Sequence, residues 1–324
     1  MKAVLCTQFG TIDDLQLADI PEPVAAEGEA VVAVKAVGLN FFDTLLVAGK
    51  YQLKPPFPFS PGAEFAGIVE RLGPGTTGLK VGDRVMGALN CGAARERIAV
   101  AASALVPLPD GLDFARAAGL MVTYGTSLYA LKRRGELCSG ETLAVLGAAG
   151  GVGLAAVELG KLLGARVIAC ASSDEKLAFA RAHGAAETVN YARDNLRDAL
   201  RTLTRGAGVD VVYDPVGGAL SEAALRALGW GGRLLVIGFA AGEIPRLPLN
   251  LTLLKSCDIR GVFWGAWAQR EPAAHLADSR DLARWCAEGR LSAHVHATYP
   301  LAEAARALRV LSERRAMGKV ILTV

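Results

Sequence analysis

Short apolar runs alternate with glycine and proline through roughly the first 120 residues, and the runs at 2–5 and 30–37 have the alternating or β-branched composition of strands. Proline- and glycine-rich segments, such as 21–23, 73–75 and 107–111, separate these runs. The pattern predicts an irregular β-rich domain over this part of the chain.

From Glu141 onward the pattern changes to apolar runs that are separated by helical stretches. The runs are apolar on both faces, which is typical of strands buried in a parallel sheet. Six strands are predicted, at 142–146, 166–171, 186–189, 209–214, 233–238 and 258–263, with helices between the first five. This alternation predicts an α/β fold, in which a doubly wound parallel sheet has helices on both faces.

The tail after Trp267 has two helical stretches, 278–288 and 301–314, and a final strand at 319–324. Because the parallel sheet already has its six strands by Phe263, we expect the tail to rejoin the first domain. The predicted division is therefore a β-rich domain made of 1–122 and 266–324, with a second domain, 123–265, inserted between them.

Composition excludes several classes of protein. With 52% hydrophobic and 21% charged residues the chain is too apolar to be disordered, and a net charge of +3 offers little attraction for nucleic acid. The longest apolar stretch, 142–157, is interrupted by glycines and is too short to cross a bilayer. The first residues lack the features of a secretory leader. We expect a cytoplasmic protein whose main partner is not nucleic acid.

Cysteine and histidine positions do not predict a metal centre. The six cysteines stand singly and form no C-x-x-C pair, which favours free thiols in a reducing compartment. His294 and His296 form an H-x-H pair, but no third ligand lies nearby in the sequence. No bound metal is expected.

A glycine-rich turn follows the strand at 142–146 and precedes an amphipathic helix. The turn contains Gly147, Gly150, Gly151, Val152 and Gly153. Glycines at these positions allow a tight turn and the close approach of a pyrophosphate, and the helix N-terminus offers unpaired N–H groups. A turn that only packs a helix on a sheet is the alternative, but the strand, turn, helix and second strand together favour a dinucleotide cofactor.

The end of the second strand bears on the choice of cofactor. An NAD-preferring site places a carboxylate there, whereas this chain has Ala171, Ser172 and Ser173, followed by the cation of Lys176. Ser172 and Glu175 also have the spacing of a capping box, so these residues alternatively begin a helix. Asp174 and Glu175 add negative charge, which weakens the case. The sequence favours NADPH over NADH.

Six further segments carry a resemblance to a known family. They are 38–43 (GLNFFD), 61–67 (PGAEFAG), 81–85 (VGDRV), 148–153 (AAGGVG), 190–191 (NY) and 214–218 (DPVGG). Together they resemble the medium-chain dehydrogenase/reductase superfamily, in its zinc-free quinone oxidoreductase (zeta-crystallin-like) branch. The resemblance covers essentially all of the chain. It implies a GroES-like catalytic domain built from both chain ends, an inserted Rossmann domain and a homodimer.

The zinc ligands of the alcohol dehydrogenase branch are missing from the matching positions. That branch has a cysteine where this chain has Asn40 and a histidine where it has Ala63, and it carries a lobe with four cysteines. Without these ligands a catalytic zinc cannot be held, so alcohol oxidation is not expected.

The resemblance also implies roles for individual residues. Asn40 and Thr126 would lie near the nicotinamide, and Phe239 with Phe263, Trp264 and Gly265 would line its site. Lys176 and Tyr191, with Arg315 or Lys319, would surround the 2′-phosphate. Tyr51 would orient the acceptor or donate a proton, or is simply an aromatic packed at a domain edge. A second tyrosine of some relatives is replaced by Leu45, and Asp43 is either a loop-fixing residue or a turn acceptor.

Three functions remain open at this point. The first is NADPH-dependent reduction of quinones by hydride transfer, and the second is reduction of an enone, enal or enoyl-thioester with the same hydride geometry. The third is a non-catalytic NADPH-binding protein. A metal-free site combined with a nicotinamide-binding turn favours the first, because a quinone needs little electrophilic help to accept a hydride.

Overall fold

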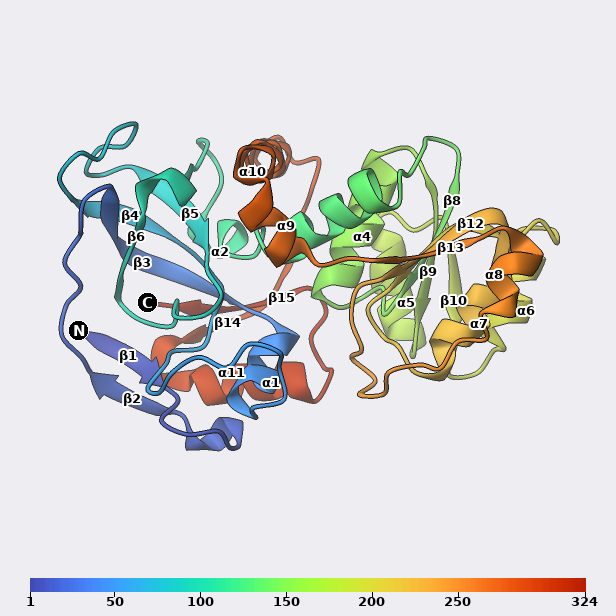
Figure 1. Ribbon diagram of the computed structural model, residues 1–324, viewed down its shortest axis with the longest axis horizontal. Coiled ribbons are helices and arrows are strands. Elements are labelled where there is room, and N and C mark those ends of the chain that lie inside the picture. The colour runs from blue at the N-terminus through green and yellow to red at the C-terminus, as the bar shows by residue number, and fades with distance from the viewer. The chain divides into compact units, whose positions relative to one another are not determined.

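A computed structural model describes all 324 residues, and the chain divides into two compact units (Figure 1). The β-rich unit consists of Met1–Val122 and Ala268–Val324, and the parallel-sheet unit consists of Thr123–Trp267. The units meet after Val122 and after Trp267; the domain boundaries expected from the sequence are after 122 and after 265.

The β-rich unit is built on a mostly antiparallel sheet with the order β14-β15-β3-β4-β5-β7, in which β6 also pairs with β3. A separate two-stranded sheet joins β1 and β2. The strands of the unit are β1 (Lys2–Leu5), β2 (Gln16–Asp19), β3 (Glu29–Leu39), β4 (Glu64–Leu72), β5 (Arg84–Ala88), β6 (Arg97–Ala101), β7 (Val106–Pro107), β14 (Val295–Pro300) and β15 (Lys319–Thr323).

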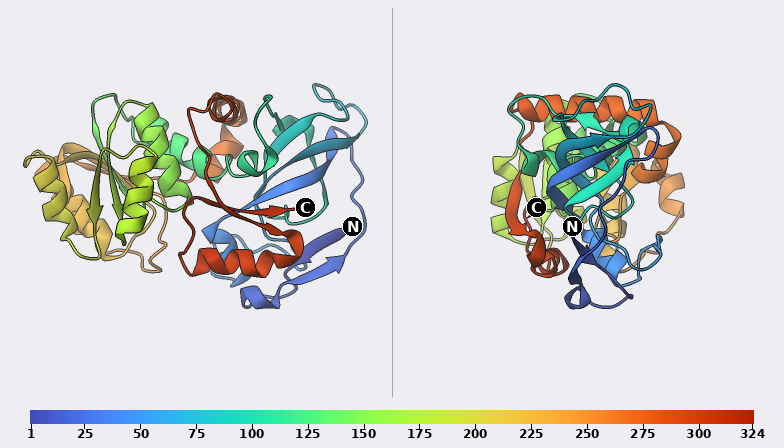
Figure 2. Two further views of the ribbon diagram at one scale, coloured as in Figure 1. Left: turned by 180° about the vertical axis from the view of Figure 1, so that it is seen from behind. Right: turned by 90° about the vertical axis from the view of Figure 1, so that its left-hand side faces the viewer.

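Both ends of the chain contribute to this sheet. Strand β15 lies between β14 and β3, and Val320 is paired with Leu39 in the antiparallel register. The red C-terminal strand β15 therefore lies beside β3, a blue strand from the first part of the chain (Figure 2). This arrangement places Lys319, at the start of β15, next to the end of β3.

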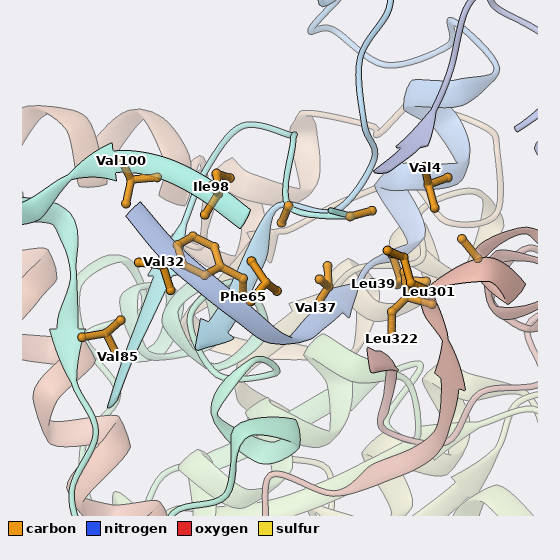
Figure 3. Packing of buried hydrophobic residues seen from close by; sticks show 14 of the residues in the cluster. Val4, Val32, Val37, Leu39, Phe65, Val85, Ile98, Val100, Leu301 and Leu322 are labelled. Carbon is orange, nitrogen blue, oxygen red and sulfur yellow. The ribbon is translucent and has the colours of Figure 1, made fainter. Parts of the chain in front are cut away.

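The core of the β-rich unit consists of aliphatic side chains with one central ring (Figure 3). Val32 and Val37 of β3 pack with Phe65 of β4, Val85 of β5 and Leu322 of β15, and all five are at most 1% exposed. Burying a side chain of this size stabilises the fold by about 1.5–3 kcal/mol. The core thus holds the two chain ends together.

Helices border this sheet, and α1 packs against α11. The expected helix at 278–288 begins earlier, at Pro272, a residue suited to the first turn of a helix because its missing N–H has no partner there. The helices are α1 (Phe41–Val47), α2 (Phe114–Ala117), α10 (Pro272–Ala287) and α11 (Ala304–Ser312), with the 3₁₀ turns η1 (Ile12–Asp14), η2 (Ala102–Ala104) and η4 (Leu301–Glu303).

The parallel-sheet unit contains the six-stranded sheet that the sequence predicts, and every neighbouring pair is parallel. Its order is β10-β9-β8-β11-β12-β13, so the direction of winding reverses between β8 and β11, the point where ligands bind in such sheets. The strands are β8 (Thr142–Leu146), β9 (Arg166–Ala171), β10 (Glu187–Asn190), β11 (Val209–Asp214), β12 (Leu228–Val236) and β13 (Asp258–Gly261).

Helices cover both faces of the parallel sheet, with α4 and α5 on one face and α6 and α7 on the other (Figures 1 and 2). The helices are α3 (Thr123–Leu128), the π-helix η3 (Tyr129–Arg134), α4 (Gly151–Leu162), α5 (Asp174–Ala182), α6 (Leu196–Leu203), α7 (Ala219–Ala227), α8 (Asn250–Lys255) and α9 (Trp264–Arg270), of which α9 runs across the second boundary. None of the helices in the chain has the length and apolar character needed to span a bilayer.

Candidate active site

The turn between β8 and α4 has two kinds of glycine. A Cβ on Gly153 would lie 2.2 Å from the carbonyl oxygen of Gly147, so this glycine is required by the packing of helix on turn. Gly150 has an ordinary φ of −74°, and its Cβ would meet nothing closer than 3.5 Å. Neither backbone strain nor packing explains Gly150, whereas close approach of a ligand does.

Helix α4 begins at this turn, and the N–H groups of its first turn can bind an anion. Its N-cap is Gly150, and no side chain caps the N–H groups of its first turn. Such N–H groups, together with the positive end of the helix dipole, favour a phosphate. The turn therefore fits the pyrophosphate of a dinucleotide, through Gly150, Gly151 and Val152.

Helix α3 is fastened to the same turn by residues that the sequence interpretation missed. The Ser127 hydroxyl lies 3.0 Å from the carbonyl oxygen of Val152 and 2.8 Å from the Tyr213 hydroxyl. No local pattern marks Ser127 and Tyr213 as partners, because 86 residues separate them. Their bonds hold Thr126, the adjacent residue of α3, near the glycine turn.

The residues expected around a nicotinamide gather only in part. The ring of Trp264 lies against Gly125, 3.1 Å from the position of a Cβ there, so Trp264 and Thr126 come from adjoining segments. Phe239 packs against Gly217 in the loop after β11 and is 37% exposed. Phe263 is 70% exposed, and Gly265 lies in helix α9 rather than in a loop.

The end of β9 shows which serine begins the next helix. Ser173, and not Ser172, is the N-cap of α5, and its hydroxyl accepts a hydrogen bond from the Lys176 backbone N–H at 3.3 Å. The expected capping box starting at Ser172 is therefore wrong by one residue. Ser172 is exposed and takes no part in the cap.

The negative charge of Asp174 is offset by two neighbours. Asn190 donates a hydrogen bond to one carboxylate oxygen at 2.8 Å, and Arg193 lies 3.2 Å from the other. The hydrogen bond from Asn190 and the charge of Arg193 lower the pKa of Asp174. Tyr191 is held beside the end of β9 by the bond from its N–H to the Ala171 carbonyl. Sequence analysis did not identify Arg193.

A buried ion pair organises the polar residues of the β-rich unit. The Lys319 ammonium lies 2.7 Å from a carboxylate oxygen of Glu64, and the two side chains are 3% and 1% exposed. Lys319 also donates to the Leu39 carbonyl at 2.9 Å and to the Asn40 side-chain oxygen at 2.8 Å. Its three N–H donors are thus in use, so the expectation that Lys319 contacts a 2′-phosphate is wrong.

The Asn40 amide is oriented by both members of this pair. Its Oδ1 accepts from Lys319, and its Nδ2 donates to Glu64 at 3.0 Å. The other Glu64 oxygen accepts from the Val122 N–H at 2.9 Å, in the segment that leads into the second unit. Nδ2 has two hydrogens, so one remains for a further acceptor.

Asp43 fixes the loop that carries Asn40. One of its oxygens accepts from the Asn40 N–H at 2.7 Å, and the other from the Gly62 N–H at 2.9 Å. Burial raises the pKa of Asp43 to about 6, although both hydrogen bonds act in the opposite direction. The carboxyl group therefore links two loops of the unit rather than facing solvent.

Tyr51 is partly buried and stacks on Phe42, with ring centroids 5.2 Å apart. Burial raises the pKa of its phenol, so the hydroxyl keeps its proton at neutral pH. Arg315 is an exposed residue of the same unit that pairs with Glu313 at 2.6 Å. Arg315 belongs to the β-rich unit, whereas Lys176 and Tyr191 belong to the parallel-sheet unit.

The side chains that could hold a metal are not clustered. No group of three or more His, Cys, Asp or Glu residues is arranged as a metal site. At the two positions noted above, Asn40 bonds to Glu64 and Lys319, and Ala63 carries no ligand atom.

Two family models match the chain. Residues 26–110 match the alcohol dehydrogenase GroES-like domain, and residues 151–279 match the model described as zinc-binding dehydrogenase. The first lies within the β-rich unit, and the second begins at the N-terminus of α4.

Several proteins are similar in sequence to almost the whole chain. The chain is 36% identical to a quinone oxidoreductase of Pseudomonas aeruginosa over 99% of both proteins. It is 36% identical to quinone oxidoreductase-like protein 2 of Rattus norvegicus over 100% of this chain and 92% of that protein. Among solved structures, Escherichia coli quinone oxidoreductase complexed with NADPH is 31% identical, covers 100% of both chains and has a TM-score of 0.92.

Proposed function

Since the chain belongs to the medium-chain dehydrogenase/reductase superfamily, in its quinone oxidoreductase branch, we propose that it reduces quinones by hydride transfer from NADPH. The observation that carries the proposal is the Asn40 amide, which the buried Lys319–Glu64 pair orients where the alcohol dehydrogenase branch has a zinc ligand. Bound NADPH supplies the hydride. The chain's own residues would bind the cofactor, orient the quinone and polarise its oxygen.

The turn at Gly147–Gly153 fits the pyrophosphate of the cofactor. Gly150 leaves room that a side chain would fill, and the first turn of α4 offers N–H donors. Ser127 keeps α3 against this turn through the Val152 carbonyl. Thr126 of α3 and Trp264, whose ring lies against Gly125, would hold the nicotinamide end of the cofactor.

The surroundings of β9 support a preference for NADPH. No carboxylate stands at Ala171, Ser172 or Ser173, where an NAD site would hold the ribose hydroxyls. The nearest acid, Asp174, is engaged by Asn190 and Arg193. Lys176, Tyr191 and Arg193 then supply cations and a hydroxyl for a 2′-phosphate.

Asn40 would stabilise the negative charge that develops on the quinone oxygen. The Lys319 ammonium at its Oδ1 polarises the amide, and this strengthens the Nδ2–H donor. A donor that is fixed before the reaction needs no reorganisation as charge develops. The Tyr51 phenol, which burial keeps protonated, would supply a second donor.

Oxidation of NADPH followed by its absorbance tests the proposal. The protein is assayed with 1,4-benzoquinone and 9,10-phenanthrenequinone beside an alkenal and crotonyl-CoA, and we expect turnover of the quinones. Turnover of the conjugated carbonyls alone would replace the proposal by an enone or enoyl-thioester reductase. Binding of NADPH without any turnover would indicate a non-catalytic protein.

Two lysine variants test the cofactor preference. Lys176→Met is expected to raise KM for NADPH about tenfold, since a charged hydrogen bond is lost, and to leave KM for NADH unchanged. The control, Lys161→Met, makes the same change of charge near the other end of α4. Equal effects on the two cofactors would contradict the assignment of Lys176 to a 2′-phosphate.

We also propose that the protein is a homodimer joined through the free edge of the parallel sheet. Strand β13 ends the sheet and pairs only with β12. Large apolar side chains near that edge are exposed, including Trp230 (78%), Leu253 (79%) and Phe263 (70%). A second copy related by a twofold axis would pair the two edges and cover these side chains.

The six free cysteines suit a reducing compartment such as the cytoplasm. Four of them, Cys6, Cys170, Cys257 and Cys286, are buried. We propose that the enzyme works there, with the thiols reduced.

A further inference from the structure

Arg95 carries a positive charge that no carboxylate neutralises. It lies between β5 and β6, where Ala3 pairs with it in an isolated β-bridge. One Nη2 hydrogen bond reaches the Ser60 hydroxyl at 3.1 Å, while Nε is buried and has no hydrogen-bond partner. The side chain is therefore partly desolvated and only partly bonded.

Arg97, two residues further on, does have carboxylate partners, so the missing counter-ion is particular to Arg95. Arg97 lies 2.8 Å from Glu70 and 3.4 Å from Glu22. For Arg95, the one titratable neighbour that affects its charge is the Cys91 thiol, and burial lowers the pKa of the guanidinium. The fold thus pairs one arginine and leaves the other without an anion.

Cys91 connects Arg95 with the candidate site, because it interacts electrostatically with both Arg95 and Asp43. The charges of Asp43 and Arg95 both affect the pKa of Cys91, and the charge of Asp43 affects the pKa of Tyr51. Burial raises the pKa of the Cys91 thiol and of the Tyr51 phenol, so both are neutral. Both oxygens of Asp43 are already bonded to backbone N–H groups. None of these side chains supplies a counter-ion.

Cys91 and Tyr51 also border an apolar cluster. Cys91 and Tyr51 pack on the small cluster of Cys6, Leu46, Val47 and Phe59. An unpaired charge beside such a surface costs stability, and proteins keep such a group where a ligand completes it. A guanidinium with an apolar neighbour matches a ligand that has an oxyanion on a hydrophobic ring.

We propose that Arg95 binds an oxyanion, a carboxylate or sulfonate, carried on the ring of the acceptor that this enzyme reduces. The planar guanidinium would take the oxyanion through Nη1 and Nη2, whose N–H groups form a fork suited to two parallel hydrogen bonds. The inference rests on the proposed reductase function and narrows its substrate class to anionic aromatic acceptors. Arg95 is a specificity-determining residue in this assignment and takes no part in hydride transfer.

The test compares 1,2-naphthoquinone with 1,2-naphthoquinone-4-sulfonate. The ratio of kcat/KM for the sulfonate over that for the neutral quinone is expected to fall about ten- to hundredfold in Arg95→Met, since a charge-assisted hydrogen bond is lost. Arg95→Lys keeps the charge but not the planar fork, so an intermediate ratio is expected. Arg97→Met, the matched control, leaves the ratio unchanged.

Two further measurements separate this inference from the proposed function. Binding of naphthalene-1-sulfonate, followed by its fluorescence, needs no turnover, and its Kd is expected to rise at least tenfold in Arg95→Met. The unfolding temperature of Arg95→Met is expected to stay the same or rise, because an unpaired charge is removed. A structural role would instead lower it.

The outcomes are distinct. If neither quinone is reduced but sulfonate binding depends on Arg95, the proposed reaction fails and the anion site stands. If both quinones are reduced, while the ratio and the sulfonate Kd are the same in wild type and Arg95→Met, the anion site is refuted and the reductase function stands.

Discussion

Replacing Lys319 by methionine removes the cation from the most buried ion pair of the β-rich unit. The Glu64 carboxylate, 1% exposed, then has no ammonium at 2.7 Å and no water to replace it. Loss of one partner from a buried pair costs about 3–5 kcal/mol, against a total of about 5–15 kcal/mol for a domain. For a unit of this size we expect the unfolding temperature to fall by about 6–20 °C.

Differential scanning calorimetry of a double-mutant cycle measures this effect. The second variant is Glu64→Gln, and the third combines it with Lys319→Met, so that no buried charge remains. The combined variant is expected to be more stable than Lys319→Met alone, with reduced kcat because Asn40 loses its polarising partner. A cost below about 1 kcal/mol for Lys319→Met, or strict additivity of the two changes, would refute the reasoning.

Four further outcomes are expected. Gly150→Ala should leave the unfolding temperature unchanged and weaken NADPH binding about tenfold in a fluorescence titration, because its Cβ has room within the protein. Gly153→Ala should instead lower the unfolding temperature, because its Cβ would lie 2.2 Å from a carbonyl oxygen; equal destabilisation by both changes would contradict this. Because burial raises the pKa of Asp43 from 3.8 to about 6, its protonated form stabilises the fold at low pH, and about 3 kcal/mol is lost as pH rises through 6. Urea unfolding at about pH 4 and pH 7 should show this loss in wild type and not in Asp43→Asn. Leu253→Asp should convert the dimer to a monomer in light scattering after gel filtration, and an unchanged mass would remove the proposed interface.

The parallel sheet could be predicted because its signals are local. Each strand is a short apolar run beside a helical stretch, and all six appear in the structure. The predicted boundary is wrong where glycine occurs inside a strand. Strand β12 begins at Leu228. The sequence predicts a start at 233 because the glycines at 229, 231 and 232 are typical of a turn.

The candidate site was predictable only where one segment carries it. The glycine turn and the end of β9 can be identified from contiguous residues, although the cap is Ser173 and not Ser172. Lys319 was assigned to the wrong partner, because its true partner, Glu64, lies 255 residues away and no local pattern links them. Arg95 gave no signal either, since the absence of a counter-ion is a property of three-dimensional packing.

The insertion of β15 between β14 and β3 also bears on how the protein is made. The Lys319 ammonium bonds to a carbonyl 280 residues earlier in the chain. At about 5–20 residues per second, the ribosome would deliver this strand roughly 15–60 seconds after β3. The parallel-sheet unit is contiguous and can fold during that interval, whereas β3 lacks its β15 partner over 36–39, although β4 and β6 can already pair with it. Chaperone binding to nascent chains is therefore expected to concentrate on β3 and to end when the last strand emerges.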